Sequence, residues 1–421
     1  MRCRIALLLL LAGCVSDSGA STVQIYSWWT TASEAQALGK VLEDFKQQDP
    51  NVTVTNPAAN NAPSAQEFLQ GQVRENDAPD TFQVNGGIEL EQYVQGASPS
   101  PLTTLDSLAT QQNWEAVMPS VILSAAKYGG HYYAVPVDVA RVNALFYNKV
   151  ALANAGIASP PTSMAEFVDD AQALAAKHLT ALAIGDAAPW ALEVIFKSCL
   201  VAAGHDYYTQ FISGANPYFA GMAGLQSDPI FDQAIACFAT FLAYSNKSEM
   251  RNLTWDAAVS EVNAGNPVMT IMGDWAHGEF LRDLGEVDVT FGEVAAPGTS
   301  DTFIYTTDAF VLPAGAKNPE GALALLAEWG SARAQGIFYQ TKGSLPSRSD
   351  ADPAKYDALQ QWTLAEFQSK SLVPDWALAL PQAFATNFDA ALDRFADDGN
   401  AENLVLAAKN NYDLIVDSHW P

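Results

Sequence analysis

The chain has 421 residues, 49% of them hydrophobic, which is enough for two or three domains with real cores and excludes a disordered protein. It carries 47 acidic and 21 basic residues, a formal charge of −26, so its surface repels nucleic acid and anionic lipid headgroups. The composition therefore favours a folded protein that stays in solution and has no nucleic-acid partner.

The N-terminus has the pattern of a targeting segment. Two arginines precede a short apolar run, which is far below the ~20 residues needed to span a bilayer but suits a secretory signal. The Leu-Ala-Gly-Cys sequence that follows resembles a bacterial lipobox. It predicts a lipoprotein signal peptide at residues 1–13, lipidation of Cys14 and a tether at residues 14–22. The alternative is ordinary cleavage nearby, with Cys14 incidental.

The first elements after the tether predict a parallel sheet. Residues 23–28 alternate like a strand, and the next segment repeats apolar residues at i, i+3, i+4 and i+7, typical of an amphipathic helix with Ser33 as its N-cap. Residues 52–55 read as a second strand, so the three elements form a βαβ unit. The same alternation predicts a helix at 65–74, a strand at 78–84, a hairpin and long strand at 129–149, a helix at 164–177, a strand at 180–186, a helical block at 190–244, and strands at 266–275 and 306–315. The fold class is therefore α/β.

Two adjacent tryptophans end the first strand. Neighbouring side chains on a strand point to opposite faces, so Trp28 and Trp29 cannot both fill one core face. Polar and aromatic residues also end other apolar runs. These are Gln83, Asn85, Asp274, Trp275 and Asp308. Ligands of open α/β sheets bind beyond the carboxyl ends of the strands, so we expect these residues to meet at a binding site.

The motifs of common enzymes are missing from the sequence. The five histidines have no metal-ligand spacing, and no Gly-x-Ser-x-Gly, Gly-x-Gly-x-x-Gly or phosphate-loop motif is present, so no metal or cofactor is expected. The 47 acidic residues could include a pair of catalytic carboxylates of the glycosidase type. An exported hydrolase or lyase is therefore the alternative to a binding protein. A carrier of polyamine or iron fits less well, because it needs more acids around the tryptophans or a Tyr or His cluster.

The aromatic, amide and carboxylate residues together suit a sugar. The apolar face of a pyranose packs on an indole, and short polar side chains bind its hydroxyls, each of which donates and accepts. Trp255 and Trp376 extend this set. For each tryptophan the alternative is a place in the core.

Two cysteines remain after the targeting segment, Cys199 and Cys237. An even pair in an exported protein predicts a disulfide, and two buried free thiols are the alternative.

Six stretches carry a resemblance to a known family. They are "SWWT", "PDTFQVNGGIEL", "YAVPVDVARVNALFYNK", "TWDAAVSEVNAGNPVMTIMGDWAHGEF", "TTDAFVLPAGAKNPEGAL" and "KGSLPSR". With them, nearly the whole chain after the tether resembles the extracellular solute-binding proteins (family 1) of bacterial ABC sugar importers, in particular their glucose- and mannose-binding branch. The resemblance implies a periplasmic, lipid-anchored monomer that is not an enzyme. It would capture glucose or a related monosaccharide and deliver it to a membrane permease.

The resemblance also implies a two-lobe periplasmic-binding-protein fold with three hinge crossings. These fall near 136–139, 306–309 and 343–346, which gives lobe 1 as 23–137 plus 309–343 and lobe 2 as 138–308 plus 344–421. The family's binding positions match Trp28 or Trp29, Gln83, Trp255, Asp274 or Trp275, Asp308 and Lys342, with Glu34, Arg141 and Asn143 as further candidates. Asn85 and Trp376 depart from the glucose-binding relatives, which have histidine at both positions. The sequence therefore does not decide whether the sugar is a monosaccharide or a disaccharide.

Overall fold

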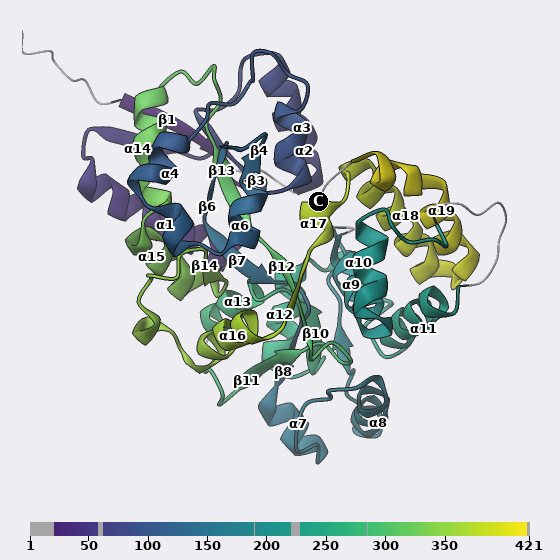
Figure 1. Cartoon of the computed structure of the whole chain (residues 1–421). Coiled ribbons are helices and arrows are strands. Elements are labelled where there is room, and N and C mark those ends of the chain that lie inside the picture. The colour runs from purple at the N-terminus through teal and green to yellow at the C-terminus, as the bar shows by residue number, and fades with distance from the viewer. Residues whose placement is uncertain (1–20, 58–61, 189, 220–227, 284, 419–421) are drawn as a thin grey trace, which may run out of the picture.

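The computed structural model describes residues 21–57, 62–188, 190–219, 228–283 and 285–418. They form a mixed α/β protein of two lobes, one in the upper left and the other along the bottom and right of Figure 1. The lipidation and signal-peptide predictions lie outside the described residues.

Lobe 1 is built on a five-stranded sheet of order β2-β1-β3-β13-β6. β1 pairs in parallel with β2 and β3, which confirms the predicted βαβ unit, whereas β13 runs antiparallel to β3 and β6. The strands are β1 (Ser21–Tyr26), β2 (Val52–Thr55), β3 (Thr81–Asn85), β6 (Ala134–Pro136) and β13 (Asp308–Val311). β1 ends before the tryptophan pair, two residues earlier than predicted.

Helices cover this sheet. They are α1 (Ala32–Gln48), α2 (Ala62–Arg74), α3 (Ile88–Val94), α4 (Asp106–Gln111), α5 (Trp114–Val117), α6 (Ser120–Ala125), α14 (Pro319–Trp329) and α15 (Ala332–Lys342), with a small hairpin of β4 (Lys127–Tyr128) and β5 (His131–Tyr132). The predicted apolar stripe of α1 is buried at Leu38, Val41 and Phe45. The N-cap prediction is wrong, because Thr31 holds that position and Ser33 lies inside the first turn.

Lobe 2 contains two four-stranded sheets. One has the order β14-β7-β12-β15, from β14 (Leu345–Pro346), β7 (Asp138–Arg141), β12 (Thr302–Thr306) and β15 (Ser371–Pro374). The other has the order β11-β8-β10-β9, from β11 (Phe291–Ala295), β8 (Ala144–Asn148), β10 (Met269–Met272) and β9 (Leu182–Ala183). The long strand predicted within 129–149 is wrong: β6, β7 and β8 belong to three different sheets, so the chain turns between them.

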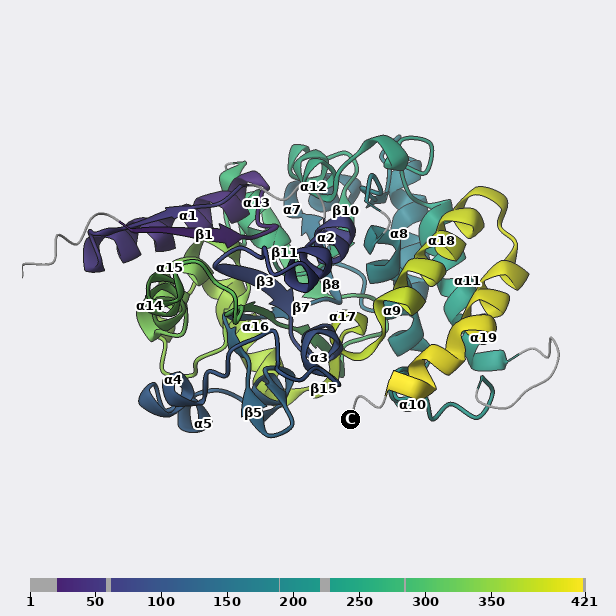
Figure 2. The ribbon, with the colours of Figure 1, turned by 90° about the horizontal axis from the view of Figure 1, so that it is seen from above.

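Most of the remaining helices pack on these sheets or beside them. They are α7 (Lys149–Ala155), α8 (Met164–Ala175), α9 (Trp190–Ala203), α10 (His205–Ile212), α11 (Pro229–Ala243), α12 (Trp255–Ala264), α13 (Ala276–Arg282), α16 (Ala358–Ser369), α17 (Trp376–Ala379), α18 (Gln382–Asp398) and α19 (Ala401–Ser418), with 3₁₀ turns at Met250–Asn252 and Pro353–Lys355. Both views place α9, α11, α18 and α19 together on the side of the molecule away from α1 and α14 (Figures 1 and 2). This helical layer has an aromatic core around Phe196, Phe211 and Phe388.

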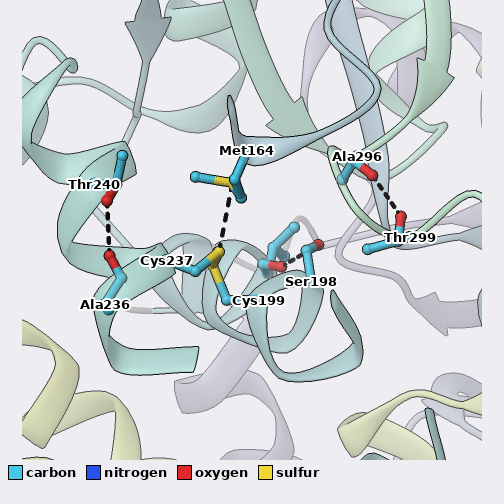
Figure 3. The surroundings of a disulfide bond; sticks show 9 residues. Met164, Ser198, Cys199, Ala236, Cys237, Thr240, Ala296 and Thr299 are labelled. Atoms are coloured by element: carbon cyan, nitrogen blue, oxygen red, sulfur yellow. Dashed lines mark hydrogen bonds between the residues drawn. A yellow bond between two sulfur atoms is a disulfide. The ribbon is translucent and has the colours of Figure 1, made fainter. Parts of the chain in front are cut away.

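A disulfide joins α9 to α11 within this layer (Figure 3). The Cys199 and Cys237 sulfurs are 2.08 Å apart, and the bond closes a sequence separation of 38 residues. Cys199 is fully buried in the core of the layer. The two cysteines are thus bonded, not free thiols.

The polypeptide passes between the lobes three times. Val137 connects β6 to β7, Thr307 connects β12 to β13, and Gly343 and Ser344 connect α15 to β14. Each of these connections is only one or two residues long, and at two of them a strand of one lobe leads directly into a strand of the other. No described helix combines the length and the apolar content needed to cross a membrane.

Candidate functional site

A cavity of about 560 Å³ is lined by residues of both lobes. Nine of the predicted site residues line it: Trp28, Trp29, Glu34, Asn85, Trp255, Trp275, Asp308, Lys342 and Trp376. They come from sequence positions more than 300 residues apart. The other four, Gln83, Arg141, Asn143 and Asp274, do not line it.

The two adjacent tryptophans take different roles because the strand stops before them. Trp29 is 1% exposed and packs against Phe338 and Phe310, with ring centroids 4.3 and 5.6 Å away, so it belongs mainly to the core although it also lines the cavity. Trp28 is half-buried and lines the cavity. Ser27 fixes this divergence, because its hydroxyl donates to Gln83 Oε1 at 2.6 Å and accepts from the Trp29 N–H at 3.3 Å.

A buried ion cluster lies where the three crossings meet. Lys342 Nζ is 3.0 Å from Asp138 Oδ2 and 2.9 Å from Asp308 Oδ2, and the Asp308 N–H donates to Asp138 Oδ1 at 2.9 Å. Burial by itself would lower the pKa of Lys342, but the two carboxylates outweigh it and raise that pKa above its usual range. Each crossing contributes one member, so the cluster connects all three. Its Asp308 and Lys342 also line the cavity.

Gln83 supports this cluster from behind the cavity wall. Its side-chain N–H donates to Asp308 Oδ1 at 2.8 Å, while its carbonyl oxygen accepts from Ser27. The residue is fully buried. It therefore orients Asp308 and the loop that carries Trp28, which is a positioning role.

Carboxyl groups from lobe 1 complete this end of the cavity. Glu34 accepts from the Thr31 hydroxyl at 2.9 Å, and burial raises its pKa to about 7 against the lowering effect of Lys342. Glu89 accepts from the Asn85 backbone and side-chain N–H groups, each at 2.9 Å, and burial raises its pKa to about 8. Around neutral pH both groups can donate as well as accept, which suits hydroxyl ligands.

The remaining predicted residues lie inside lobe 2. Asn143 is fully buried between β7 and β8, and its amide bonds Thr299, Thr302 and the Ile304 N–H, so it fixes this turn to β12. Arg141 is also fully buried, with its guanidinium carbon 5.0 Å from the Trp362 ring.

Asp274 joins the same interior. It accepts from the Arg141 N–H at 2.9 Å, and burial raises its pKa to about 8. The structure thus gives Arg141, Asn143 and Asp274 partners within lobe 2 and does not bring them to the cavity.

In lobe 2, two glycines allow the tryptophans of the cavity to lie close to the backbone of the sheet. A Cβ on Gly273 would lie 2.1 Å from the Trp275 ring, and one on Gly185 would lie 2.2 Å from the Thr254 carbonyl oxygen. The glycines therefore let the ring of Trp275 and the start of α12, which carries Trp255, approach the sheet. Trp376 is 1% exposed and packs against Phe388 and Phe211. It therefore lines the cavity as part of the core and does not offer an exposed ring for a ligand to stack on.

Several cavity residues carried no signal in the sequence. Trp190 packs edge-on against Trp275, with centroids 6.1 Å apart. Glu193, Lys197, Asp375 and Asp389 form a second charged group, in which Lys197 Nζ lies 2.7 Å from Glu193 Oε1 and 2.5 Å from Asp375 Oδ1. Only the Glu193–Lys197 spacing on one helix could have indicated this pair, and nothing in it points to a cavity.

The lobes also contact each other beside the crossings. Glu279 of α13 accepts from the Ser33 N–H at 3.0 Å and from its hydroxyl at 2.6 Å. A carboxylate of lobe 2 thus caps α1 of lobe 1, at the helix end where negative charge is favourable. A Cβ on Gly87 would lie 2.2 Å from the Leu378 carbonyl oxygen, so α3 and α17 also touch.

Comparisons with known proteins give a consistent family. A family model described as bacterial extracellular solute-binding protein matches residues 40–398. An uncharacterized ABC transporter extracellular-binding protein of Pyrococcus horikoshii is 32% identical over 411 residues, covering 92% of this chain and 89% of that protein. A probable sugar-binding periplasmic protein of Rhizobium meliloti is 28% identical over 354 residues, covering 84% and 82%.

Solved structures share the fold at low sequence identity. A bacterial solute receptor described as preferring β-D-galactopyranose has a TM-score of 0.80 at 19% identity, with coverage of 95% of this chain and 100% of that one. A chitin oligosaccharide binding protein also has a TM-score of 0.80, at 18% identity, covering 94% and 100%. The two-lobe fold predicted from the sequence is confirmed. The prediction of a binding protein over an enzyme is confirmed by the family model and by the relatives, which are described as solute-binding or sugar-binding proteins.

Proposed function

Because the chain belongs to the bacterial extracellular solute-binding proteins, we propose that it captures a sugar between its two lobes for an ABC importer. The observation that carries this proposal is the cavity wall. It combines the half-buried indoles of Trp28, Trp255 and Trp275 with amides and carboxyls that both donate and accept. Indoles cover the apolar face of a pyranose, and the polar groups satisfy its hydroxyls.

The names of relatives support the same class of ligand. Besides the protein of Rhizobium meliloti, a xylose/arabinose-binding protein of Haloferax volcanii is 24% identical over 366 residues, with coverage of 85% of this chain and 76% of that protein. We propose that the recognised unit here is a glucose- or mannose-type ring, as the resemblance to that branch implies. Asn85 keeps donor and acceptor groups where the glucose-binding relatives have histidine, so it can still bind hydroxyls.

In the proposed mechanism, ligand binding closes the lobes. The lobes, 23–137 plus 309–343 and 138–308 plus 344–421, would rotate about the three crossings. A ligand that touches both lobes gains contacts only in the closed form, so it shifts the population toward that form. Because the ion cluster of Asp138, Asp308 and Lys342 lies at the crossings themselves, it can stay intact while the outer walls of the cavity separate.

Delivery to a membrane permease completes the proposed function. We propose that the protein acts as a monomer, held at the membrane by lipid on Cys14. Each buried CH₂ contributes about 0.8 kcal/mol, so several acyl chains hold firmly. Mass spectrometry of the mature protein tests the anchor: a diacylated or triacylated Cys14 at the N-terminus is expected, and an unmodified N-terminus contradicts it.

A thermal-shift screen of monosaccharides and short oligosaccharides, followed by calorimetry, tests the sugar. Bound ligand raises the Tm by mass action, and a micromolar Kd, about −8 kcal/mol, is expected for the best sugar. Trp255→Ala should abolish detectable binding with the fold intact, whereas Leu323→Ala, on an exposed position of α14, should leave it unchanged. A wild-type protein that binds none of these sugars contradicts the proposal.

A further inference from the structure

We propose that the ligand has at least two sugar rings, and that Glu193, Lys197, Asp375 and Asp389 form a second subsite for the ring farther from the crossings. This inference rests on the proposed function, since it takes the first ring to be a sugar beside Trp28 and Lys342. It replaces the expected monosaccharide by an oligosaccharide that contains that unit.

The size of the cavity is the first argument. An apolar cavity of about 150 Å³ accepts one benzene ring. The cavity here has about 560 Å³, more than three times as much. One pyranose held near Lys342 would leave much of this volume, and the polar groups that face it, to water.

The second argument is the position of the far wall. α9 lines the cavity with Trp190, Glu193, Val194 and Lys197, and α18 lines it with Gln382, Ala385, Thr386 and Asp389. Both sets have the spacing i, i+3, i+4, i+7, so each is one continuous helix face about 10 Å long. Figures 1 and 2 place α9 and α18 on the side away from α1 and α15, which carry Glu34 and Lys342. The cavity thus reaches from the crossings to the helical layer.

The face of α18 that lines the cavity is not the face that carries its aromatic core residues. The helix buries Phe384, Phe388 and Phe395 in its core, and the cavity residues lie on a different face. Two of them, Gln382 and Thr386, are neutral polar side chains of the kind that bind sugar hydroxyls. Leu380 and Ala385 add apolar surface between the polar groups.

The chemistry of the charged group fits a pair of ring hydroxyls. Lys197 is 3% exposed, and its two ion pairs use two of the three N–H groups of the ammonium, which leaves one to donate. Burial and a hydrogen bond with Glu193 raise the pKa of Asp389 well above its usual range, so these two carboxyls share a proton. Asp389 Oδ1 is buried without a hydrogen-bond partner and can accept. Vicinal hydroxyls need this combination of donors and acceptors.

A purely structural ion pair is the competing explanation. Replacing a buried ion pair by apolar residues is often neutral or stabilising, so the fold alone has little need for four ionisable groups here. Their presence on a cavity wall is accounted for by a polar ligand. The two explanations differ in what a change in the far wall does to long and short ligands.

The test is calorimetry of the whole protein with glucose, mannose and xylose and with their di- and trisaccharides. The best oligosaccharide should bind at least about tenfold more tightly than its monosaccharide, which is about 1.4 kcal/mol. Ala385→Trp, which fills the far end, should remove this gain and keep monosaccharide affinity within about twofold. Ala383→Trp, exposed on the same helix and away from the cavity, is the matched control and should change neither.

Asp389→Asn tests the same point without added bulk, and it should weaken only the oligosaccharide. The inference is overturned if a monosaccharide binds as tightly as its oligosaccharides, or if Ala385→Trp and Asp389→Asn weaken both ligands equally or neither. Binding of no sugar at all would instead refute the proposed function, and this inference with it.

Discussion

Lys342 Nζ lies 2.9 Å from Asp308 Oδ2, although the two residues stand at different crossings between the lobes. Asp138, from the remaining crossing, completes the contact at 3.0 Å. One buried cation therefore balances a carboxylate from each of the other two crossings, and it lies at the edge of the cavity. A change in this ion cluster would therefore affect both the crossings between the lobes and the wall of the cavity.

Loss of this cation should destabilise the protein strongly. In Lys342→Met the carboxylates of Asp138 and Asp308 stay buried without a counter-charge, and breaking such a pair costs about 3–5 kcal/mol. Urea unfolding measures the change. Lys317→Met removes an exposed ion pair with Asp77 and should leave the free energy of unfolding unchanged. Equal effects of the two variants would contradict a structural role for the cluster.

The adjacent tryptophans should respond in opposite ways to truncation. Trp29→Ala empties a packed core site and should cost about 3–5 kcal/mol of stability. Trp28→Ala removes a cavity wall and should cost far less stability but most of the sugar affinity. Chemical unfolding and calorimetry on both variants separate the two effects. The assignment is reversed if Trp28→Ala unfolds the protein while Trp29→Ala binds normally.

The disulfide should stabilise the helical layer mainly by restricting the unfolded chain. With a sequence separation of 38 between the cysteines, loop-closure entropy gives about 4 kcal/mol, and native strain can reduce this value. Replacing both Cys199 and Cys237 by Ala should lower the midpoint of unfolding in urea. Reductant should lower the unfolding midpoint of the wild type by a similar amount and leave that of the double variant unchanged. A wild-type midpoint that does not respond to reductant would contradict this prediction.

Stability should fall as the pH rises toward about 8, in part because of Glu89. Burial raises its folded pKa to about 8 from an ordinary value of 4.5, so the folded state holds the proton more tightly than the unfolded state. The free energy of unfolding then decreases between about pH 4.5 and 8, by a few kcal/mol in order of magnitude. Glu89→Gln cannot titrate and should flatten this slope.

The control for this experiment is Glu43→Gln, at an exposed position of α1, which should keep the wild-type slope. Thermal unfolding of the ligand-free protein at several pH values gives the three profiles. Identical slopes in wild type and Glu89→Gln would show that Glu89 does not titrate in this range.

Local pattern was sufficient for much of the fold. The alternation of residues 23–26, the apolar stripe of α1 and the strand at 52–55 each depend on neighbours a few positions away, and together they predicted the βαβ unit that the structure contains. The aromatic and polar residues at the strand ends also pointed to a shared edge, because parallel strands place their carboxyl ends together. Of the nine predicted residues around the cavity, Trp28, Trp29, Asn85 and Trp275 follow from that rule, whereas Asp308 opens the antiparallel strand β13 and the other four do not come from strand ends.

What only the tertiary structure decided were the partners across long sequence distances. Trp28 and Trp29 are the same residue type at adjacent positions, and it is the core of Phe310 and Phe338 that selects Trp29 for burial. Asp274 lies two residues beyond the end of β10, which stops before the predicted strand end, and its bond to Arg141 holds it inside lobe 2. Glu193 and Lys197 are spaced as an i, i+4 pair on α9, but no local pattern indicated that Asp375 and Asp389 would join them, because that depends on how helices from distant segments pack.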